Sequence, residues 1–321
     1  MTIKKIMSIN RSNDQLSIDW SIGKKCNFDC SFCVDNVHDN FSKPLKFEVF
    51  KKALLKIKKA YPEKKLEISL DGGEPFLNPD ILKIVKFCKD QEVRVGTTSN
   101  GSAKLDLLRD VYKYLDYLII SLHQEFYSES IKNKIIELNK MSKTLNKFFR
   151  VNLMILPGYI DKIKEDLKFL NGNNIPYIMR KVRPLTYKKS TFILPYKLRN
   201  KRDNKQYFNK TELDFLSKYS ENNIHADIQL IYDDNTIKNI NSNELVFFGK
   251  TNFKGWKCRT MFEQMLIKAN GDVHYCISAQ PFGNKIGNIY TEDFKIIKKD
   301  IFCKSDSCNC ISDLHITKER I

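Results

Sequence analysis

Eight of the nine cysteines of the chain fall into two groups, one near each end of the sequence. The N-terminal group is Cys26, Cys30 and Cys33, and the C-terminal group is Cys258, Cys276, Cys303, Cys308 and Cys310. In a reducing compartment, clustered cysteines more often bind a metal or take part in redox chemistry than form disulfides. The two groups therefore predict two metal or iron–sulfur sites.

The N-terminal group has one cysteine fewer than a closed four-ligand site needs. A structural zinc site would require a fourth ligand, and His38 is the nearby candidate. Three thiolates can instead hold a [4Fe–4S] cluster and leave one iron open to a further ligand. The spacing of the three cysteines alone leaves both interpretations open.

A second motif, Asp71-Gly72-Gly73-Glu74-Pro75, follows a predicted strand. Two adjacent glycines allow an unusual turn and a close approach of the backbone, and a carboxylate beside them suits an ammonium group. Taken alone, such a sequence is most often a turn and nothing more. Its place one predicted β/α unit after the cysteines makes it a candidate binding segment.

Together the two motifs resemble the signature of the radical S-adenosylmethionine (SAM) superfamily. The cysteine spacing C-x3-C-x2-C, with an aromatic residue before the last cysteine, is similar to the motif that holds the family's [4Fe–4S] cluster, and "GGEP" is similar to its segment for the SAM amino group. The resemblance implies that Cys26, Cys30 and Cys33 are cluster ligands and catalytic residues. It also implies SAM contacts at Phe32, Gly72, Gly73, Glu74, Pro75, Ser99, Asn100 and Ser121.

The same resemblance implies an enzyme of a particular reaction class. The reduced cluster would give one electron to SAM, and the resulting 5′-deoxyadenosyl radical would take hydrogen from a substrate, in an oxidation or another modification. The expected partners are a one-electron reductant such as flavodoxin or ferredoxin, and a peptide or small polar metabolite as substrate. Ser121-Leu122-His123 departs from the Ser-x-Asp-Gly pattern of many peptide-modifying members, so the substrate class stays open.

The C-terminal cysteines resemble a SPASM or twitch domain, which holds auxiliary iron–sulfur clusters in a subgroup of that family. Cys258 precedes a predicted hairpin with Asn270-Gly271 at its turn, and Cys276 ends it. Five cysteines cannot complete two four-ligand sites, so we expect one auxiliary [4Fe–4S] cluster on Cys258, Cys276 and two of Cys303, Cys308 and Cys310. A structural zinc site on the same residues is the alternative.

Alternating strand and helix patterns predict an α/β fold for the first 183 residues. We predict strands at residues 16–22, 66–70, 93–98, 117–122, 149–156 and 177–182, and helices at 47–60, 79–89, 105–114, 128–145 and 160–170. One face of these strands is apolar and the other is polar, which favours a partial (β/α)6 barrel of parallel strands around an internal cavity. The polar face holds Asp19, Ser21, Glu67, Ser69, Arg94, Ser121, Arg150 and Asn152.

Three domains are expected: a barrel core at 1–183, a basic linker and bridging segment at 184–255, and the small iron–sulfur domain at 256–321. The formal charge of the 321-residue chain is +17, and residues 180–210 alone hold eleven Lys or Arg, one Asp and several aromatic residues. A rival function is therefore a non-catalytic iron–sulfur or zinc protein that binds nucleic acid through this segment. That function gives no reason for the Gly-Gly-Glu-Pro motif.

The sequence also bears on location. No apolar run approaches the roughly 20 residues of a membrane-spanning helix, so we expect no membrane partner. The N-terminal residues lack the apolar region of a signal peptide. We therefore expect a cytoplasmic protein.

Overall fold

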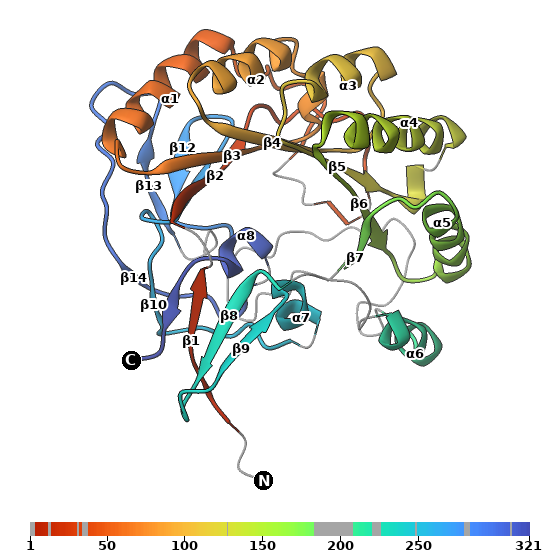
Figure 1. The fold of residues 1–321 in the computed structure, drawn as a ribbon. Coiled ribbons are helices and arrows are strands. Elements are labelled where there is room, and N and C mark those ends of the chain that lie inside the picture. Colours follow the sequence, from red (N-terminus) through yellow and green to blue (C-terminus); the bar gives the residue numbers. More distant parts are fainter. Residues whose placement is uncertain are drawn as a thin grey trace.

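The computed structural model describes residues 4–11, 14–30, 32–33, 38–126, 128–182, 208–219, 226–247, 249–278, 283–308 and 310–321. Its main sheet has nine strands in the order β13-β12-β11-β2-β3-β4-β5-β6-β7. Six of them run parallel in chain order: β2 (Gln15–Ser21), β3 (Lys65–Asp71), β4 (Arg94–Ser99), β5 (Tyr117–Leu122), β6 (Phe148–Ile155) and β7 (Tyr177–Lys181). The described strands curve without closing into a barrel, which is consistent with the predicted partial barrel (Figure 1).

Helices cover the convex face of this sheet (Figure 1). Trp20 of β2 is fully buried and lies 4.4 Å from Phe50, ring centroid to ring centroid. Burying one such side chain contributes about 1.5–3 kcal/mol, so the apolar strand face and the helices stabilise each other. The helices that follow the first five parallel strands are α1 (Phe47–Ala60), α2 (Ile81–Asp90), α3 (Leu105–Tyr112), α4 (Glu129–Leu145) and α5 (Ile160–Gly172).

The C-terminal part extends the main sheet. Its hairpin, β11 (Gln264–Ile267) and β12 (Asp272–His274), is followed by β13 (Lys285–Asn288). Strand β11 pairs in parallel with β2, so the chain's last quarter adds directly to the N-terminal strands. Trp20 strengthens this join, because its Nε1 donates to the Tyr290 hydroxyl at 3.1 Å.

A second sheet lies opposite the concave face of the first (Figure 1). Its order is β14-β10-β15-β1-β8-β9, and its strands are β1 (Ile6–Arg11), β8 (Ile228–Tyr232), β9 (Ile237–Ile240), β10 (Lys257–Cys258), β14 (Ile301–Phe302) and β15 (Lys318–Glu319). The short helices α7 (Ser242–Phe247) and α8 (Ile311–Leu314) accompany it, and α6 (Lys210–Tyr219) lies beyond α5. Because β1 pairs with both β8 and β15, the sheet joins the three expected domains, whose boundaries stay a prediction.

The predicted α/β class is confirmed, and every predicted parallel strand is present to within about a residue at each end. Three helix ends differ by two residues: α2 begins at Ile81 and not at 79, α3 ends at Tyr112 and not at 114, and α5 ends at Gly172 and not at 170. Before α2, the Asn78 side chain is buried and donates to the carbonyls of Ile22 and Leu45. Most of the basic segment 180–210 lies outside the described residues. Within the part that is described, no helix has the length and apolar character needed to cross a bilayer.

Candidate active site

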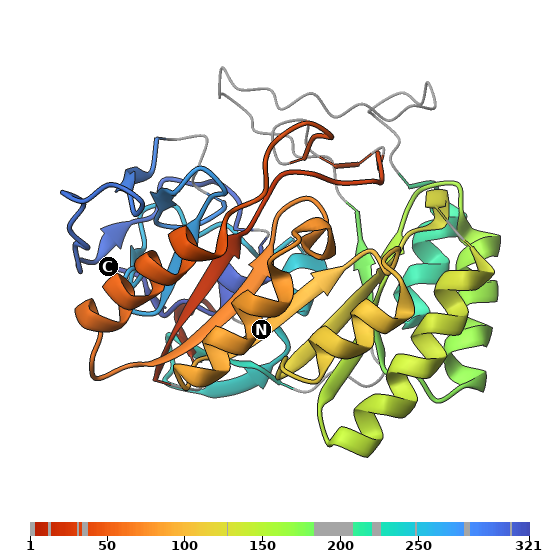
Figure 2. The same cartoon turned by 90° about the horizontal axis from the view of Figure 1, so that it is seen from above.

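The two glycines of the Gly-Gly-Glu-Pro motif lie against the start of the cysteine loop, which leaves the end of β2 (Figure 2). Gly72 has a φ of +132°, and a Cβ atom on Gly73 would lie 2.3 Å from the carbonyl oxygen of Lys25. In return, the Glu74 amide donates to that carbonyl at 2.8 Å, and the Gly73 amide donates to Gly23 at 3.1 Å. Only glycine allows this backbone contact, which fixes the loop that carries Cys26.

The carboxylate of Glu74 joins the motif to the end of β4. It is buried and accepts hydrogen bonds from the Phe76 amide at 3.1 Å, the Ser99 hydroxyl at 2.8 Å and the Asn100 amide at 2.7 Å. Burial raises the pKa of Glu74, and these hydrogen bonds lower it in part. A carboxylate has about four acceptor positions, so the three protein donors leave one for a ligand such as an ammonium group.

The N-terminal thiols are half-buried, and a side-chain nitrogen lies beside each of two of them. Nδ1 of His123 is 3.6 Å from Sγ of Cys30, and Nδ2 of Asn100 is 3.9 Å from Sγ of Cys26. Burial raises the pKa of Cys30, and the nearby Cys33 raises it further. Nitrogen donors directed at sulfur are the usual surroundings of an iron–sulfur cluster.

His123 forms an aromatic wall beside the cysteine loop. Its ring stacks on Phe32 with centroids 5.4 Å apart and an angle of 8°, and burial lowers the pKa of His123 to about 4. The imidazole is therefore neutral near pH 7, with one nitrogen able to donate. The sequence marked His123 only as a departure from a family pattern, because a contact over 93 residues has no local signal.

The other predicted site residues occupy the same end of the sheet. Pro75 is buried in the short helix η1 (Pro75–Leu77), and Ser121 is half-buried on β5 opposite Asn152. His38, the candidate zinc ligand, lies 3.7 Å from the carboxylate of Asp29. Among the described residues, no three His, Cys, Asp or Glu side chains form a group that could hold a single metal ion.

The C-terminal cysteines come from three separate segments. Cys258 of β10 and Cys276 after β12 share a small buried cluster, and Cys303 and Cys308 contact the adjoining one. Hydroxyl and amide groups face the sulfurs: Nδ2 of Asn284 is 3.8 Å from Cys276 Sγ, and the Ser278 hydroxyl is 3.8 Å from Cys308 Sγ.

Lys318 brings a positive charge to these sulfurs. The side chain is 1% exposed, and its Nζ donates to the carbonyls of Asp313 and Ile316. Burial lowers the pKa of Lys318, but Cys308, Cys258, Asp313 and Cys276 outweigh burial, so the net shift is upward. A buried cation among thiols suits a site that becomes anionic when the thiols lose their protons.

Cys310 has different surroundings from the other C-terminal cysteines. Burial raises the pKa of its thiol, and the next largest contributions come from Asp313 and Asp19. Asp19 belongs to the polar face of β2. The charge of Cys310 also raises the pKa of Arg180 on β7. The Cys310 thiol therefore shares charge effects with Asp19 and Arg180, which line a cavity on the concave face of the main sheet.

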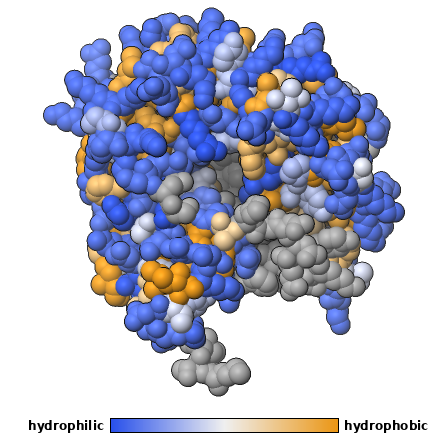
Figure 3. Space-filling model, in the orientation of Figure 1, coloured by the Kyte–Doolittle hydropathy of each residue, from blue (hydrophilic) through white to orange (hydrophobic). Residues whose placement is uncertain are grey.

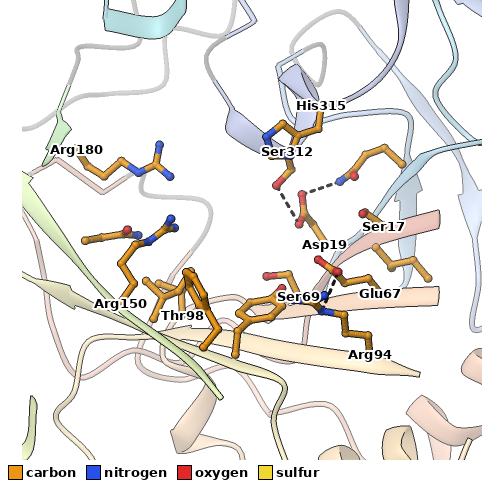
Figure 4. A pocket seen from close by; sticks show the side chains of 16 residues that line it. Ser17, Asp19, Glu67, Ser69, Arg94, Thr98, Arg150, Arg180, Ser312 and His315 are labelled. Atoms are coloured by element: carbon orange, nitrogen blue, oxygen red, sulfur yellow. Dashed lines mark hydrogen bonds and ion pairs between the residues drawn. The ribbon is translucent and has the colours of Figure 1, made fainter. Parts of the chain in front are cut away.

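A cavity of about 330 Å³ lies on that concave face. Figure 4 shows Asp19, Glu67, Ser69 and Arg94 on one side of it and Arg150 and Arg180 on the other. Most of the residues predicted for the polar strand face line the cavity, so that part of the fold prediction is confirmed. In the space-filling view the surface is hollowed near the centre and largely hydrophilic around the hollow (Figure 3).

Two residues connect the cavity to its surroundings. Asp19 accepts from Nε2 of Gln264 at 2.8 Å and from the hydroxyl of Ser312, so the C-terminal segment forms one wall. Thr98, another lining residue, directly precedes Ser99, which binds Glu74. The cavity therefore extends along β4 to the residue before the end of that strand.

Three kinds of comparison find similar proteins. Residues 20–170 match the family model described as Radical SAM superfamily. The S-adenosylmethionine-dependent nucleotide dehydratase RSAD2 of Oncorhynchus mykiss is 30% identical over 158 residues, which are 47% of this chain and 43% of that protein. The GTP 3',8-cyclase of Campylobacter jejuni is 27% identical over 93 residues, which are 28% of this chain and 29% of that protein.

The solved structure of Streptococcus suis SuiB bound to its precursor peptide SuiA has a similar fold. The TM-score is 0.58 at 17% identity, and the match covers 87% of this chain and 63% of SuiB. The chain spans less than half the length of the two curated relatives named above, and less than two thirds of SuiB.

Proposed function

Residues 20–170 form a domain of the radical SAM superfamily, and we propose that the chain is an enzyme that cleaves SAM reductively. Its substrate would lie in the cavity on the concave face of the sheet and lose a hydrogen atom there. The observation that carries this proposal is the contact between the two N-terminal motifs: Glu74 lies against the cysteine loop and keeps one acceptor position for a ligand.

Three thiols would hold the [4Fe–4S] cluster: those of Cys26, Cys30 and Cys33. When bound, the cluster supplies the electron, taken from an external reductant, that splits SAM into methionine and a 5′-deoxyadenosyl radical, which takes hydrogen from the substrate to give 5′-deoxyadenosine. The donor set supports this assignment, because His123 and Asn100 direct nitrogen atoms at the sulfurs of Cys30 and Cys26.

The residues around this loop have separable tasks. Gly72 and Gly73 keep the cysteine loop close to β3, and Glu74 would accept a hydrogen bond from the SAM ammonium. Phe32 and its stacked partner His123 would exclude water from one side of the cluster. Ser99 and Asn100 hold the Glu74 carboxylate in place, so their contribution to SAM binding would be partly indirect.

We assign the auxiliary [4Fe–4S] cluster to Cys258, Cys276, Cys303 and Cys308. Beyond the effect of burial, Lys318 lowers the pKa values of Cys258, Cys303 and Cys308, and Cys258, Cys276 and Cys308 raise the pKa of Lys318 in turn. The pKa of Cys310 is instead raised by burial, Asp313 and Asp19. Four thiols with one buried cation suit a closed site. Such a site could take up an electron from the substrate after hydrogen removal.

The substrate would be either a peptide or a small polar metabolite. SuiB was solved with a precursor peptide, and the two curated relatives are named for nucleotide chemistry. The walled cavity of about 330 Å³ fits a small polar molecule or a single side chain of a peptide.

The test is anaerobic reconstitution with iron and sulfide, reduction with dithionite in the presence of SAM, and measurement of 5′-deoxyadenosine. We expect the wild-type protein to form 5′-deoxyadenosine and Cys30→Ala to form none above background. Cys88→Ala is the matched control, since Cys88 is a buried residue of α2 in the main hydrophobic core and the variant should stay active. If wild type forms none, or Cys30→Ala equals wild type, the proposal is wrong.

A further inference from the structure

Two arginines reach into the cavity from neighbouring strands. Arg150 lies on β6 and Arg180 on β7, and Figure 4 shows both guanidinium groups directed into the cavity from the same side. Burial, and after it the charge of Arg150, lower the pKa of Arg180 to about 10. Two buried like charges repel each other, so this arrangement costs free energy unless something compensates them.

Arg94, which lines the same cavity, has an acidic partner. Its Nε lies 3.1 Å from a carboxylate oxygen of Glu67, so its charge is balanced by a protein side chain. Among the described residues, Arg150 has no such ion pair, and its Nε is buried without a hydrogen-bond partner. Among the described residues, Arg94 therefore has a carboxylate partner, whereas Arg150 has none and its guanidinium lies 5.5 Å from the ring centroid of Phe148.

Asp227 is the acidic residue whose charge acts most on Arg150, but its carboxylate is already hydrogen-bonded to other residues. The charge of Asp227 raises the pKa of Arg150 but does not overcome burial. Its carboxylate accepts from the Ser242 amide at 2.6 Å, the Ser242 hydroxyl at 2.9 Å and Nε2 of His315 at 3.1 Å. Asn152, two residues beyond Arg150, also leaves its Oδ1 buried without a partner among the described residues.

We propose that Arg150 and Arg180 bind an anionic group of the substrate, a phosphate or a carboxylate. Guanidinium groups present paired N–H donors that match both anions, and a charge of opposite sign would remove the repulsion between them. This inference rests on the proposed function, because it takes the cavity as the place where substrate lies. Bound there, the rest of the substrate would extend past Thr98 toward the end of β4, where Ser99 contacts Glu74.

The wall of the cavity that holds Asp19, opposite Arg150 and Arg180, carries less charge than the arginine wall, and this supports the proposed orientation of the substrate. Burial raises the pKa of Asp19, and Asp71 and Asp313 raise it further, which favours the neutral carboxyl. Gln264 and Ser312 add uncharged donors on that wall. An anionic group would therefore bind at the β6–β7 wall, with hydroxyl or amide groups of the same molecule facing Asp19.

The test measures anion binding without turnover. Reconstituted protein is titrated calorimetrically with sodium pyrophosphate in one arm and sodium succinate in the other, for wild type, Arg150→Gln, Arg180→Gln and the double variant. Arg109→Gln is the matched control, because this arginine lies on α3 outside the cavity and pairs with Glu137. Circular dichroism and thermal melting check that each variant is folded.

We expect each cavity variant to weaken binding of the preferred anion by about tenfold or more, the usual loss when a charged hydrogen bond is removed. Arg109→Gln should bind as wild type does. Preference for pyrophosphate would identify a phosphate group, and preference for succinate a carboxylate. The anion should also raise the melting temperature of wild type and leave that of the double variant unchanged.

Two results would overturn the inference: no binding of either anion by wild type, or equal loss in Arg109→Gln and the cavity variants. These outcomes are separable from a failure of the proposed function. Absence of 5′-deoxyadenosine from wild type would contradict SAM cleavage, whereas the calorimetric comparison needs no SAM and measures the arginine wall alone.

Discussion

The two cysteine groups are built in contrasting ways. Cys26, Cys30 and Cys33 lie on one loop, and its start is held by backbone contacts to Gly72 and Gly73. The C-terminal thiols come from β10, the end of a hairpin and the segment before α8, and they meet around a lysine. The first group is local in sequence and the second depends on the whole C-terminal fold.

The difference extends to the groups that face the sulfurs. The N-terminal thiols have neutral nitrogen donors, since burial lowers the pKa of His123 to about 4 and Asn100 is an amide. The C-terminal thiols have a buried ammonium in Lys318. A neutral site with a free acceptor at Glu74 suits ligand exchange, whereas a charge-balanced site with more thiols suits a closed cluster that only moves electrons.

The contrast between the two cysteine groups is tested most strongly by a substitution that removes one whole cluster. Cys308→Ala should reduce the iron content of reconstituted protein from about eight to about four per chain, the value for one cubane cluster. Cys310→Ala is the matched variant from the same segment and should keep the full content, because Asp19 acts on the pKa of its thiol where Lys318 acts on that of Cys308. Iron and sulfide analysis decides, and equal losses in both variants would contradict the assigned ligand set.

A second substitution tests how the N-terminal loop is held. Gly73→Ala would put a Cβ atom 2.3 Å from the Lys25 carbonyl, so the loop has to move. Overpacking of this kind costs about 1–3 kcal/mol in the free energy of unfolding, and we expect loss of iron from the N-terminal site alone. Urea unfolding and iron analysis measure both effects.

Gly172→Ala is the control for that substitution. A Cβ atom at Gly172 would meet nothing within 4 Å, and this residue ends helix α5. It should be neutral or stabilise the protein by about 0.4–1 kcal/mol through the unfolded chain. If Gly73→Ala proves as stable as Gly172→Ala and keeps its iron, the glycine contact does not fix the loop.

The N-terminal half of the molecule was the part that could be predicted best from the sequence. The parallel strands and their polar face were predictable because alternation with a period of two residues survives in each strand. Arg150 and Asn152 could be placed in the cavity on that basis before any contact was known. The contacts of Glu74 with Ser99 and Asn100 could not, since they connect residues 25 and 26 positions apart that show no shared pattern.

The short C-terminal strands and the buried lysine beside them could not be predicted from the sequence. Strands β10, β14 and β15 have two residues each, too few for any periodic pattern. They form because distant segments meet in one sheet, where β15 pairs with β1 and β10 pairs with β15 and β14. Lys318 is one of many lysines in a chain of high positive charge, and nothing in its neighbourhood sets it apart. Its burial among thiols follows from tertiary packing alone.

The smallest expected effect concerns that lysine and tests the electrostatic side of the contrast. A positive charge near a redox centre favours the reduced, more negative state, so Lys318→Met should lower the midpoint potential of the auxiliary cluster. A charged hydrogen bond contributes about 1.5–3 kcal/mol, and about 1.4 kcal/mol corresponds to 59 mV for one electron, so we expect a shift on the order of 60 mV or more. Lys318→Arg keeps the charge and should shift the potential less, which separates the effect of the charge from that of the lost hydrogen bonds to Asp313 and Ile316.

A redox titration followed by electron paramagnetic resonance measures both clusters, and the midpoint potential of the N-terminal cluster should not change. An unchanged or higher potential in Lys318→Met would mean that the ammonium acts only on folding, and the two sites would then differ in construction but not in electrostatics.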